Sequence, residues 1–333
     1  MIHLDISEEL KNAYKDYILD KKYQQNLYFK KTIEKSFKDK FKEIYRKEII
    51  KKKRYGDLKK FLKFVCRKLE NFIIGDLDKL KDLQNEIEAK FPKFIKNLKK
   101  FLRDRQSKKK KVTFKDYEII YDLFVKKGYE SIVSDKMAYE FIKALDVKVC
   151  PYCNINYISY VRDNKNKAVR PALDHFYPKE KYPWFAISLY NLVPICKDCN
   201  SLKSNKFTSR LRSAYKISEN NNDFVFEIDY NILDKNMSLK DIEEEIKKID
   251  FKKSIKGNKE IFKLFERYQF HKDIVAEILW KKISTNEDYL SSFKNLGINE
   301  DEAYRIIFCN YLNSENFKQR PLSKLTYDVY NCL

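Results

Sequence analysis

The sequence predicts a mainly α-helical protein with a small α+β core in the middle of the chain. Three observations lead to this fold class. Apolar residues recur at helical spacing before residue 146 and again beyond residue 210. Between these regions the helical period is lost, and cysteine, proline and asparagine become frequent. Two C-x-x-C pairs frame the middle segment, which indicates a zinc ion that fastens its two ends.

These shifts in composition predict three domains. We expect a basic helical domain over residues 1–145, a zinc-bearing unit over residues 146–210, and a mainly helical region over residues 211–333. A hydrophobic fraction of 43% supplies enough apolar side chains for these cores.

The first region carries apolar stripes that fit one face of a helix. The stripes are Ile33, Phe37, Phe41 and Ile44; Leu58, Phe61, Leu62, Val65 and Leu69; and Phe94, Leu98, Phe101 and Leu102. Pro92 stands before the third stripe, where it suits a first helical turn. A loop is predicted at residues 104–112, followed by helices near 114–127 and 135–145. We interpret the stripes as packing surfaces between helices.

The middle segment predicts two strands followed by a short helix. The text "NYISYVRD" at 156–163 alternates as a strand does, and "RPALDHFYP" at 170–178 predicts a second strand. The text "KDCNSLKSNKF" at 197–207 predicts the helix. Beyond it, "DFVFEIDYNI" at 223–232 is a strand candidate, and residues 238–249 and 261–283 predict helices. Ser238 suits the N-cap of the first of these helices.

The chain carries a formal charge of +21, which attracts polyanions and predicts nucleic acid as a partner. A lysine-rich composition also arises in proteins without such a partner, so charge alone leaves both interpretations open. The 5 glycines lie far apart and build no phosphate-binding loop, so we expect this chain to bind no nucleotide cofactor.

Nothing in the sequence predicts a membrane segment. No stretch approaches the ~18 apolar residues of a transmembrane helix, and the acidic, amphipathic N-terminus is unlike a signal peptide. We therefore expect a cytoplasmic protein without a membrane partner. In that reducing compartment, cysteines serve more often as metal ligands or core residues than as disulfides.

Four cysteines form the predicted zinc site: Cys150 and Cys153 in "CPYCN", and Cys196 and Cys199 in "CKDCN". Each pair makes a tight turn whose two thiolates reach one ion, and two turns complete a tetrahedral shell. The intervening residues 154–195 are long enough for two strands and a loop. Because four thiolates leave no open coordination position, the zinc is predicted to be structural.

The stretch "LDHFYPK" places Asp174 beside His175, one of only 3 histidines, in an apolar segment. The pair is either a buried structural pair or part of a site. Asn191 lies between the cysteine pairs, and Asn200 and Lys203 follow the last cysteine.

Together, the text "CPYC…LDHFYPK…NLVPICKDCNSLK" resembles the HNH, or ββα-metal, endonuclease family. The family pattern runs C-x-x-C, D-H-x-x-P, N-L-x-P-x-C and C-N-x-x-K, and each element occurs here in that order over about 60 residues. The resemblance implies a zinc-stapled ββα-metal unit between N- and C-terminal helical regions. One departure is Asn154, where the family often has glycine; asparagine also tolerates a left-handed backbone.

The resemblance also implies a role for each residue in phosphodiester hydrolysis. His175 would be the general base, with one ring nitrogen held by a backbone carbonyl. Asp174 and Asn200 would hold a catalytic Mg²⁺ or Mn²⁺ through oxygen atoms. Asn191 would hold the loop that orients His175, and Lys203 would contact a phosphate. Since a strand alternates its side chains, we expect an irregular strand end at Asp174 and His175.

The amino-acid sequence of the motif is similar to that of HNH nucleases of anti-phage systems such as Septu and its retron-linked relatives. That similarity implies a role in antiviral defence and a partner ATPase of the ABC or AAA-like class. The leading interpretation is a DNA endonuclease. Two alternatives remain: a nuclease that cuts RNA, for instance tRNA, with the same site, and a zinc-stabilised nucleic-acid-binding module without catalysis.

Overall fold

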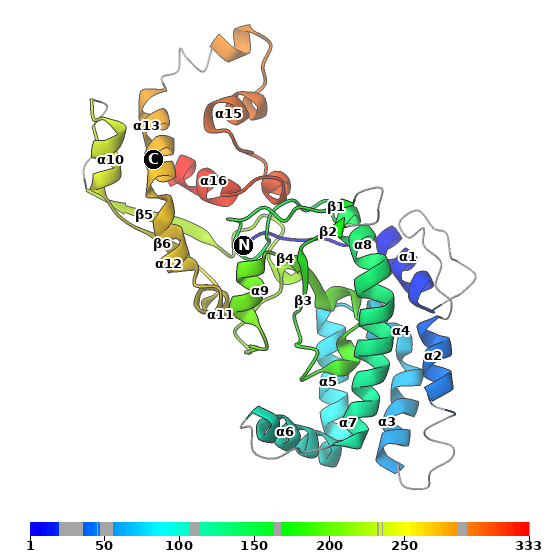
Figure 1. Ribbon diagram of the computed structural model, residues 1–333. Helices are drawn as coiled ribbons and strands as arrows, with labels where there is room; N and C mark the ends of the chain where they lie inside the picture. The colour runs from blue at the N-terminus through cyan, green and yellow to red at the C-terminus, as the bar shows by residue number, and fades with distance from the viewer. Residues whose placement is uncertain are drawn as a thin grey trace. The chain divides into compact units, whose positions relative to one another are not determined.

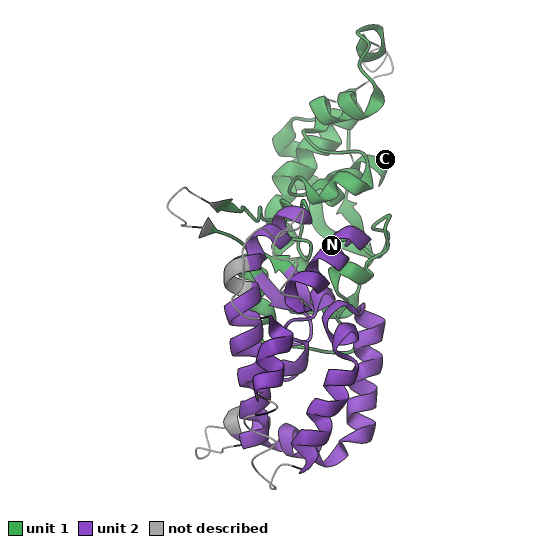
Figure 2. Ribbon diagram, turned by 90° about the vertical axis from the view of Figure 1, so that its right-hand side faces the viewer, with its two compact units in different colours: residues 1–4, 146–172, 194–333 green, residues 5–145, 173–193 purple. Residues whose placement is uncertain are grey.

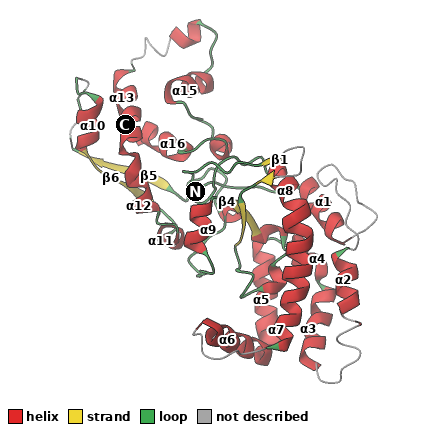
Figure 3. Ribbon diagram, in the orientation of Figure 1, coloured by secondary structure: helices red, strands yellow, loops and turns green. Residues whose placement is uncertain are grey.

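Figure 1 shows a computed structural model of the protein, which describes residues 1–19, 36–44, 46, 56–106, 114–162, 168–231, 233–234, 236–285 and 292–332. The described chain is mainly helical with a few short strands, as the sequence predicts (Figure 3). It forms two compact units (Figure 2). Unit 1 comprises residues 1–4, 146–172 and 194–333, and unit 2 comprises residues 5–145 and 173–193.

Unit 2 consists of the helices of residues 5–145 together with the segment 173–193. Its helices are α1 Glu8–Leu19, α2 Phe37–Ile44, α3 Gly56–Arg67, α4 Leu69–Ile74, α5 Leu77–Lys90, α6 Pro92–Gln106, α7 Lys115–Tyr121, the π-helix η2 Asp122–Met137, and α8 Ala138–Ala144. Two short 3-10 turns, η3 Pro183–Phe185 and η4 Leu189–Asn191, belong to the segment 173–193.

The predicted apolar stripes supply the core of unit 2. Phe61 packs edge-on against Trp184 with ring centroids 5.6 Å apart, and Phe72 stacks on Phe185 at 5.7 Å. The Trp184 indole donates a hydrogen bond to Gln84 Oε1 at 3.2 Å, which satisfies its only polar group. The segment 173–193 is therefore embedded among the helices that precede it. Ile33 of the first stripe and residues 107–112 of the predicted loop lie outside the described residues, and the loop prediction is wrong for residues 104–106, which belong to α6.

The two helices predicted near 114–127 and 135–145 form one continuous helical run, because η2 fills the gap between them. Gly128 allows the backbone of η2 to pack closely against Ile187 and Phe37. A Cβ added at Gly128 would stand 2.8 Å from Ile187 Cγ2 and 3.1 Å from the Phe37 ring. The backbone of η2 thus approaches its neighbours more closely than another residue type allows.

Unit 1 contains shorter helices and two antiparallel strand pairs. Its helices are α9 Lys197–Lys203, α10 Leu239–Glu245, α11 Lys256–Ile261, α12 Leu264–Tyr268, α13 Lys272–Ser284, α15 Glu300–Phe308 and α16 Ser323–Cys332, with 3-10 turns η5 Ala214–Lys216, η6 Gln269–His271 and η7 Ser314–Lys318. Strand β1 Val161–Arg162 pairs with β2 Ala168–Val169, and β5 Val225–Tyr230 pairs with β6 Ile246–Lys253. Strands β3 Ala172–His175 and β4 Leu192–Ile195 pair with each other where the chain passes from one unit to the other.

Ser238 is the N-cap of α10, as predicted, and forms a capping box with Asp241. The predicted helix over 238–249 is wrong beyond Glu245, because β6 begins at Ile246. Ile249 pairs with Ile228 of β5, and the rings of Phe226 and Phe251 lie 4.7 Å apart. Pairing with a distant strand therefore overrides the local helical period.

The predicted helix over 261–283 is divided into shorter elements. Lys263 adopts a left-handed backbone conformation with φ of 52°, which separates α11 from α12. Among the described residues, no helix has the length and apolar character needed to span a bilayer.

Candidate functional site

The four predicted cysteines gather in unit 1. Their sulfur atoms all lie within 4.8 Å of one another, and all four side chains are buried. Sulfurs bound to one Zn²⁺ at about 2.3 Å stand about 3.8 Å apart in a tetrahedron. Cys153 Sγ and Cys196 Sγ are 3.9 Å apart. The cluster therefore fits a zinc ion, and the four cysteines could hold one.

Local backbone geometry positions each pair. In the first turn, Asn154 N donates to Cys150 O at 2.7 Å and Cys150 N donates to Asn156 O at 2.9 Å. In the second, Cys196 is the N-cap of α9 and its sulfur accepts from Cys199 N at 3.4 Å. Tight turns of this kind turn both sulfurs of a pair to the same side.

The surroundings of the cluster favour thiolates at some positions. Hydrogen bonds from Cys150, Cys153 and Cys199 lower the pKa of the Cys196 thiol, and burial raises the pKa of Cys150. Arg267 Nη1 donates to Cys199 Sγ at 3.3 Å. A cationic donor beside a buried cluster offsets part of the negative charge that four thiolates and one Zn²⁺ would carry.

Arg267 is a residue that the sequence interpretation missed. It also stands 3.6 Å from Asp198 Oδ2, which accepts a 2.7 Å hydrogen bond from Asn156. These contacts link α12 to both cysteine turns. The residue lies 68 positions from Cys199, and no local pattern could have indicated that contact.

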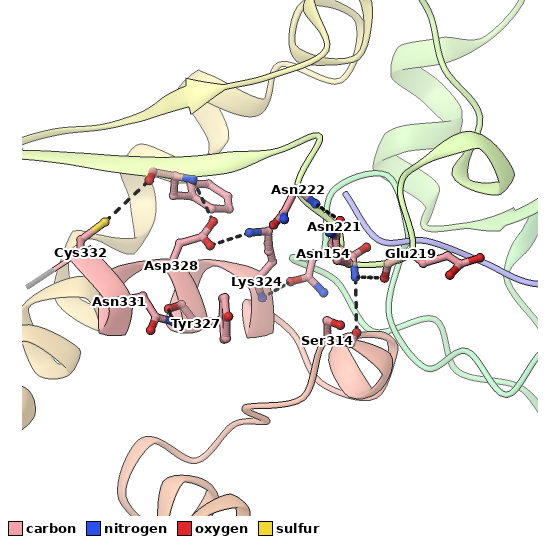
Figure 4. A network of polar contacts seen from close by, with 12 residues as sticks. Asn154, Glu219, Asn221, Asn222, Ser314, Lys324, Tyr327, Asp328, Asn331 and Cys332 are labelled. Atoms are coloured by element: carbon pink, nitrogen blue, oxygen red, sulfur yellow. Dashed lines mark hydrogen bonds and ion pairs between the residues drawn. The ribbon is translucent and has the colours of Figure 1, made fainter.

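Asn154 adopts the left-handed conformation that the sequence predicts, with φ of 53°, and is fully buried. Its amide also binds the C-terminal segment (Figure 4). Nδ2 donates to the carbonyls of Phe317 and Arg320 at 3.2 and 3.4 Å. Oδ1 accepts from Lys324 N at 3.1 Å and from Ser323 Oγ at 3.3 Å. The first cysteine turn is thereby tied to the start of α16.

The helix α16 is further anchored by a buried ion pair. Lys324 Nζ and Asp328 Oδ1 are 2.5 Å apart, and both side chains are almost fully buried. Asp328 Oδ2 accepts a 2.9 Å hydrogen bond from Phe226 N of β5. The chain's last helix is thus connected by polar contacts to the cysteine turn and to β5 (Figure 4).

We expect Asn154→Gly to lower the free energy of unfolding by about 2–4 kcal/mol, because glycine keeps the left-handed turn but loses four buried hydrogen bonds. Urea unfolding of the zinc-loaded protein measures this. Asn156→Gly, on the same turn, is the control: it loses one solvent-exposed hydrogen bond, to Asp198, and should therefore lower the free energy of unfolding by less than Asn154→Gly does. A glycine variant at 154 as stable as wild type would show that the amide contributes nothing beyond backbone conformation.

Asp174 and His175 lie in unit 2 at the end of β3, and both are buried, with exposed fractions of 5% and 7%. Both residues belong to the strand itself, and adjacent side chains on a strand point to opposite faces, so both faces of β3 are covered here. His175 Nε2 is 3.0 Å from Ala186 O. Because a carbonyl only accepts, Nε2 carries the proton and Nδ1 carries the basic lone pair of the neutral ring.

Asn191 braces the loop around His175. Its Oδ1 accepts from Tyr177 N at 2.6 Å, and its Nδ2 donates to Tyr177 O at 3.2 Å and to Phe185 O at 2.9 Å. Phe185 immediately precedes Ala186, whose carbonyl holds the imidazole. The amide therefore connects the chain following β3 to the turn that orients His175.

Tyr129 of η2 is a second residue that the sequence interpretation missed. Its ring packs edge-to-face on the His175 imidazole with centroids 4.4 Å apart. Lys179 Nζ lies 5.1 Å from the centroid of the Tyr129 ring and 3.5 Å from Glu130 Oε1. Tyr129 lies between the two helices predicted near 114–127 and 135–145, and nothing in the sequence indicated that it would contact His175.

Asn200 and Lys203 lie on α9 in unit 1, whereas Asp174, His175 and Asn191 lie in unit 2. Asn200 is exposed, which leaves its amide accessible to a ligand. Lys203 has an exposed fraction of 0%. It is therefore not a solvated surface lysine, and a phosphate would reach it only in a recess.

The other two histidines, His3 and His271, also contact other residues of the chain. His271 is partly buried against Tyr268, with centroids 6.0 Å apart, and burial lowers its pKa. His3 Nδ1 lies 2.7 Å from Ile217 O.

Comparison of the chain with family models, curated proteins and solved structures finds no match.

Proposed function

We propose that this protein is a metal-dependent endonuclease of the HNH type that hydrolyses phosphodiester bonds of DNA. The observation that carries the proposal is the orientation of His175. Its Nε2–H is committed to the Ala186 carbonyl at 3.0 Å, which makes Nδ1 the proton acceptor. A general base needs a positioned lone pair, and the hydrogen bond to Ala186 fixes the ring nitrogen that would supply it.

In the proposed reaction, His175 Nδ1 removes a proton from water, and the resulting hydroxide attacks the phosphorus while the P–O bond to the leaving 3′ oxygen breaks. That oxygen takes a proton from solvent. Asp174 and Asn200 are the residues that would hold Mg²⁺ or Mn²⁺; the ion would neutralise charge on the phosphate and on the leaving oxygen. Asn191 and Tyr129 keep the imidazole in place through the contacts described above. A zinc ion held by four thiolates has no open position for water, so it would take no part in the reaction. The role assigned to the four-cysteine cluster is therefore to stabilise the fold.

The charge of +21 favours a nucleic-acid substrate. Hydrolysis by water needs no 2′-hydroxyl, so RNA, including tRNA, is the second candidate substrate. A role in anti-phage defence with an ABC or AAA-like ATPase partner is part of the proposal and rests on the sequence similarity of the motif alone. The non-catalytic alternative needs only the zinc-stabilised fold and the basic charge, and the cleavage assay below distinguishes it from the nuclease.

The proposal is tested with a panel of substrates. We expect purified, zinc-loaded protein to cut plasmid DNA when Mg²⁺ or Mn²⁺ is added and to leave it intact with Ca²⁺ or with no added ion. Ca²⁺ is larger and takes more ligands in a flexible geometry, so it would position the phosphate less strictly than Mg²⁺. Gel assays on plasmid, single-stranded DNA and total RNA measure this. Cleavage of RNA alone would replace the DNA assignment. Binding of nucleic acid without cleavage under any of these conditions would favour the non-catalytic module.

A further inference from the structure

A pocket of about 450 Å³ opens on unit 2, lined by residues of α5, of α6 and of the segment before and within η3. Ile95, Leu98 and Leu102 supply its apolar surface, and the first two are buried. The aromatic side chains of Tyr182 and Trp184 supply another part of its wall. This volume and lining are typical of a site that accepts a flat or apolar group of small-molecule size.

Three cations and one carboxylate line the same pocket. The cations are Lys99, Arg103 and Lys181, and the carboxylate is Glu88. Glu88 accepts a 3.0 Å hydrogen bond from Gln84 and lies 3.8 Å from Lys99. Its charge is therefore already shared, and the positive balance at the pocket favours an anionic ligand.

The positive charge of α6 extends beyond the residues that line the pocket. The helix sequence PKFIKNLKKFLRDRQ contains six lysines or arginines and one aspartate. Lys93, Lys96 and Lys100 are exposed on it and do not line the pocket. A free small anion would need only the pocket, whereas cations that extend from Lys93 to Arg103 suit a ligand with repeated negative charges.

We propose that this face of unit 2 binds single-stranded nucleic acid, with phosphates along α6 and one base in the pocket. Tyr182 lines the pocket and is only partly buried, although Tyr177, Trp184 and Phe185 pack around its ring, so a base would stack on the part that faces the pocket. Burial together with the nearby Glu88 raises the pKa of its phenol, which stays neutral. Stacking on an aromatic ring beside a cationic groove is how proteins hold single strands without reading their sequence.

The inference rests on the proposed function only in taking the bound strand to be the substrate. Binding itself is measured with full-length His175→Ala protein, which should not cut. The probes are a fluorescent oligothymidine of about 12 nucleotides and an abasic strand of equal length and charge. We expect the base-bearing strand to bind at least about 5-fold more tightly, because stacking of one base contributes at least that factor.

Variants then separate the two contributions. Tyr182→Leu should bind both strands alike, whereas Tyr182→Phe should keep the preference for bases, because only the ring is needed. Lys99→Glu with Arg103→Glu should weaken both strands. Lys59→Glu with Lys63→Glu, an exposed pair of equal charge and spacing on α3, is the matched control and should bind as the parent does.

Equal affinity of the parent protein for both strands would overturn the pocket assignment. Equal weakening by the α6 and α3 double variants would overturn the assignment of the strand to α6. Thymidine monophosphate binding as tightly as the strand would identify a nucleotide site instead. If wild-type protein cuts no substrate while the base preference and its loss in Tyr182→Leu persist, the proposed catalysis fails and the binding surface stands.

Discussion

His175→Ala is expected to lower the rate of DNA cleavage by about 10³-fold, within the range of about 10² to 10⁴ that general-base catalysis contributes. Alanine removes Nδ1 and therefore the only proton acceptor assigned to the attacking water. It also leaves the Ala186 carbonyl without its 3.0 Å donor. That loss costs about 1–3 kcal/mol of stability, so the variant should remain folded under assay conditions.

The measurement is a single-turnover cleavage assay at saturating Mg²⁺, with zinc content and the urea midpoint recorded for the same samples. His271→Ala is the matched control, because His271 packs against Tyr268 and has no assigned role. It should cleave as wild type does. A His175→Ala variant with undiminished cleavage would remove His175 from the mechanism, while equal losses in both variants would point to a general effect on folding.

The parts of the site that the sequence predicted correctly are those fixed by local geometry. A C-x-x-C turn brings two sulfurs to one side whatever surrounds it, so Cys150, Cys153, Cys196 and Cys199 could be identified from spacing alone. The left-handed turn at Asn154 is equally local. The roles in catalysis given to Asp174, His175, Asn191, Asn200 and Lys203 stay predictions.

Apart from the meeting of the two cysteine pairs, contacts between distant segments could not be predicted. Tyr129 and His175 meet only because η2 packs on the segment 173–193. Arg267 reaches Cys199 from 68 residues away. A single sequence shows the chemical type of these side chains but not their neighbours, and an exposed arginine on a helix has the same local pattern as a buried one.

The strand β6 shows the same limit for secondary structure. The text after Ser238 has helical spacing, and its capping box forms as expected. Beyond Glu245, however, the residues complete a ladder with β5, and Ile246 and Ile249 are buried there. Whether an isoleucine is buried by a helix face or by a strand face depends on which partner is present, and local propensity does not decide this. Lys203 is a further case, since nothing in its polar surroundings indicated complete burial.

Cys150→Ser is expected to abolish zinc binding and to unfold the part of unit 1 around the cysteine turns. Structural zinc sites contribute about 10–16 kcal/mol of apparent binding free energy, whereas a whole domain is stable by only about 5–15 kcal/mol. Losing one of four ligands therefore removes a free energy comparable to the entire stability of the unit. Metal content by mass spectrometry and thermal unfolding by circular dichroism measure the result.

Two control variants and a chelator experiment distinguish loss of the metal from a general effect of replacing cysteine. Cys66→Ser and Cys309→Ser change exposed cysteines outside the cluster and should keep one zinc per chain and the wild-type melting temperature. A strong zinc chelator should reproduce the Cys150→Ser phenotype in wild type, and added Zn²⁺ should reverse it only in wild type. Because a closed thiolate shell offers no position for water, cleavage should fall only as the folded fraction falls. A Cys150→Ser protein that keeps its zinc and its melting temperature would mean that the cluster does not hold the fold together.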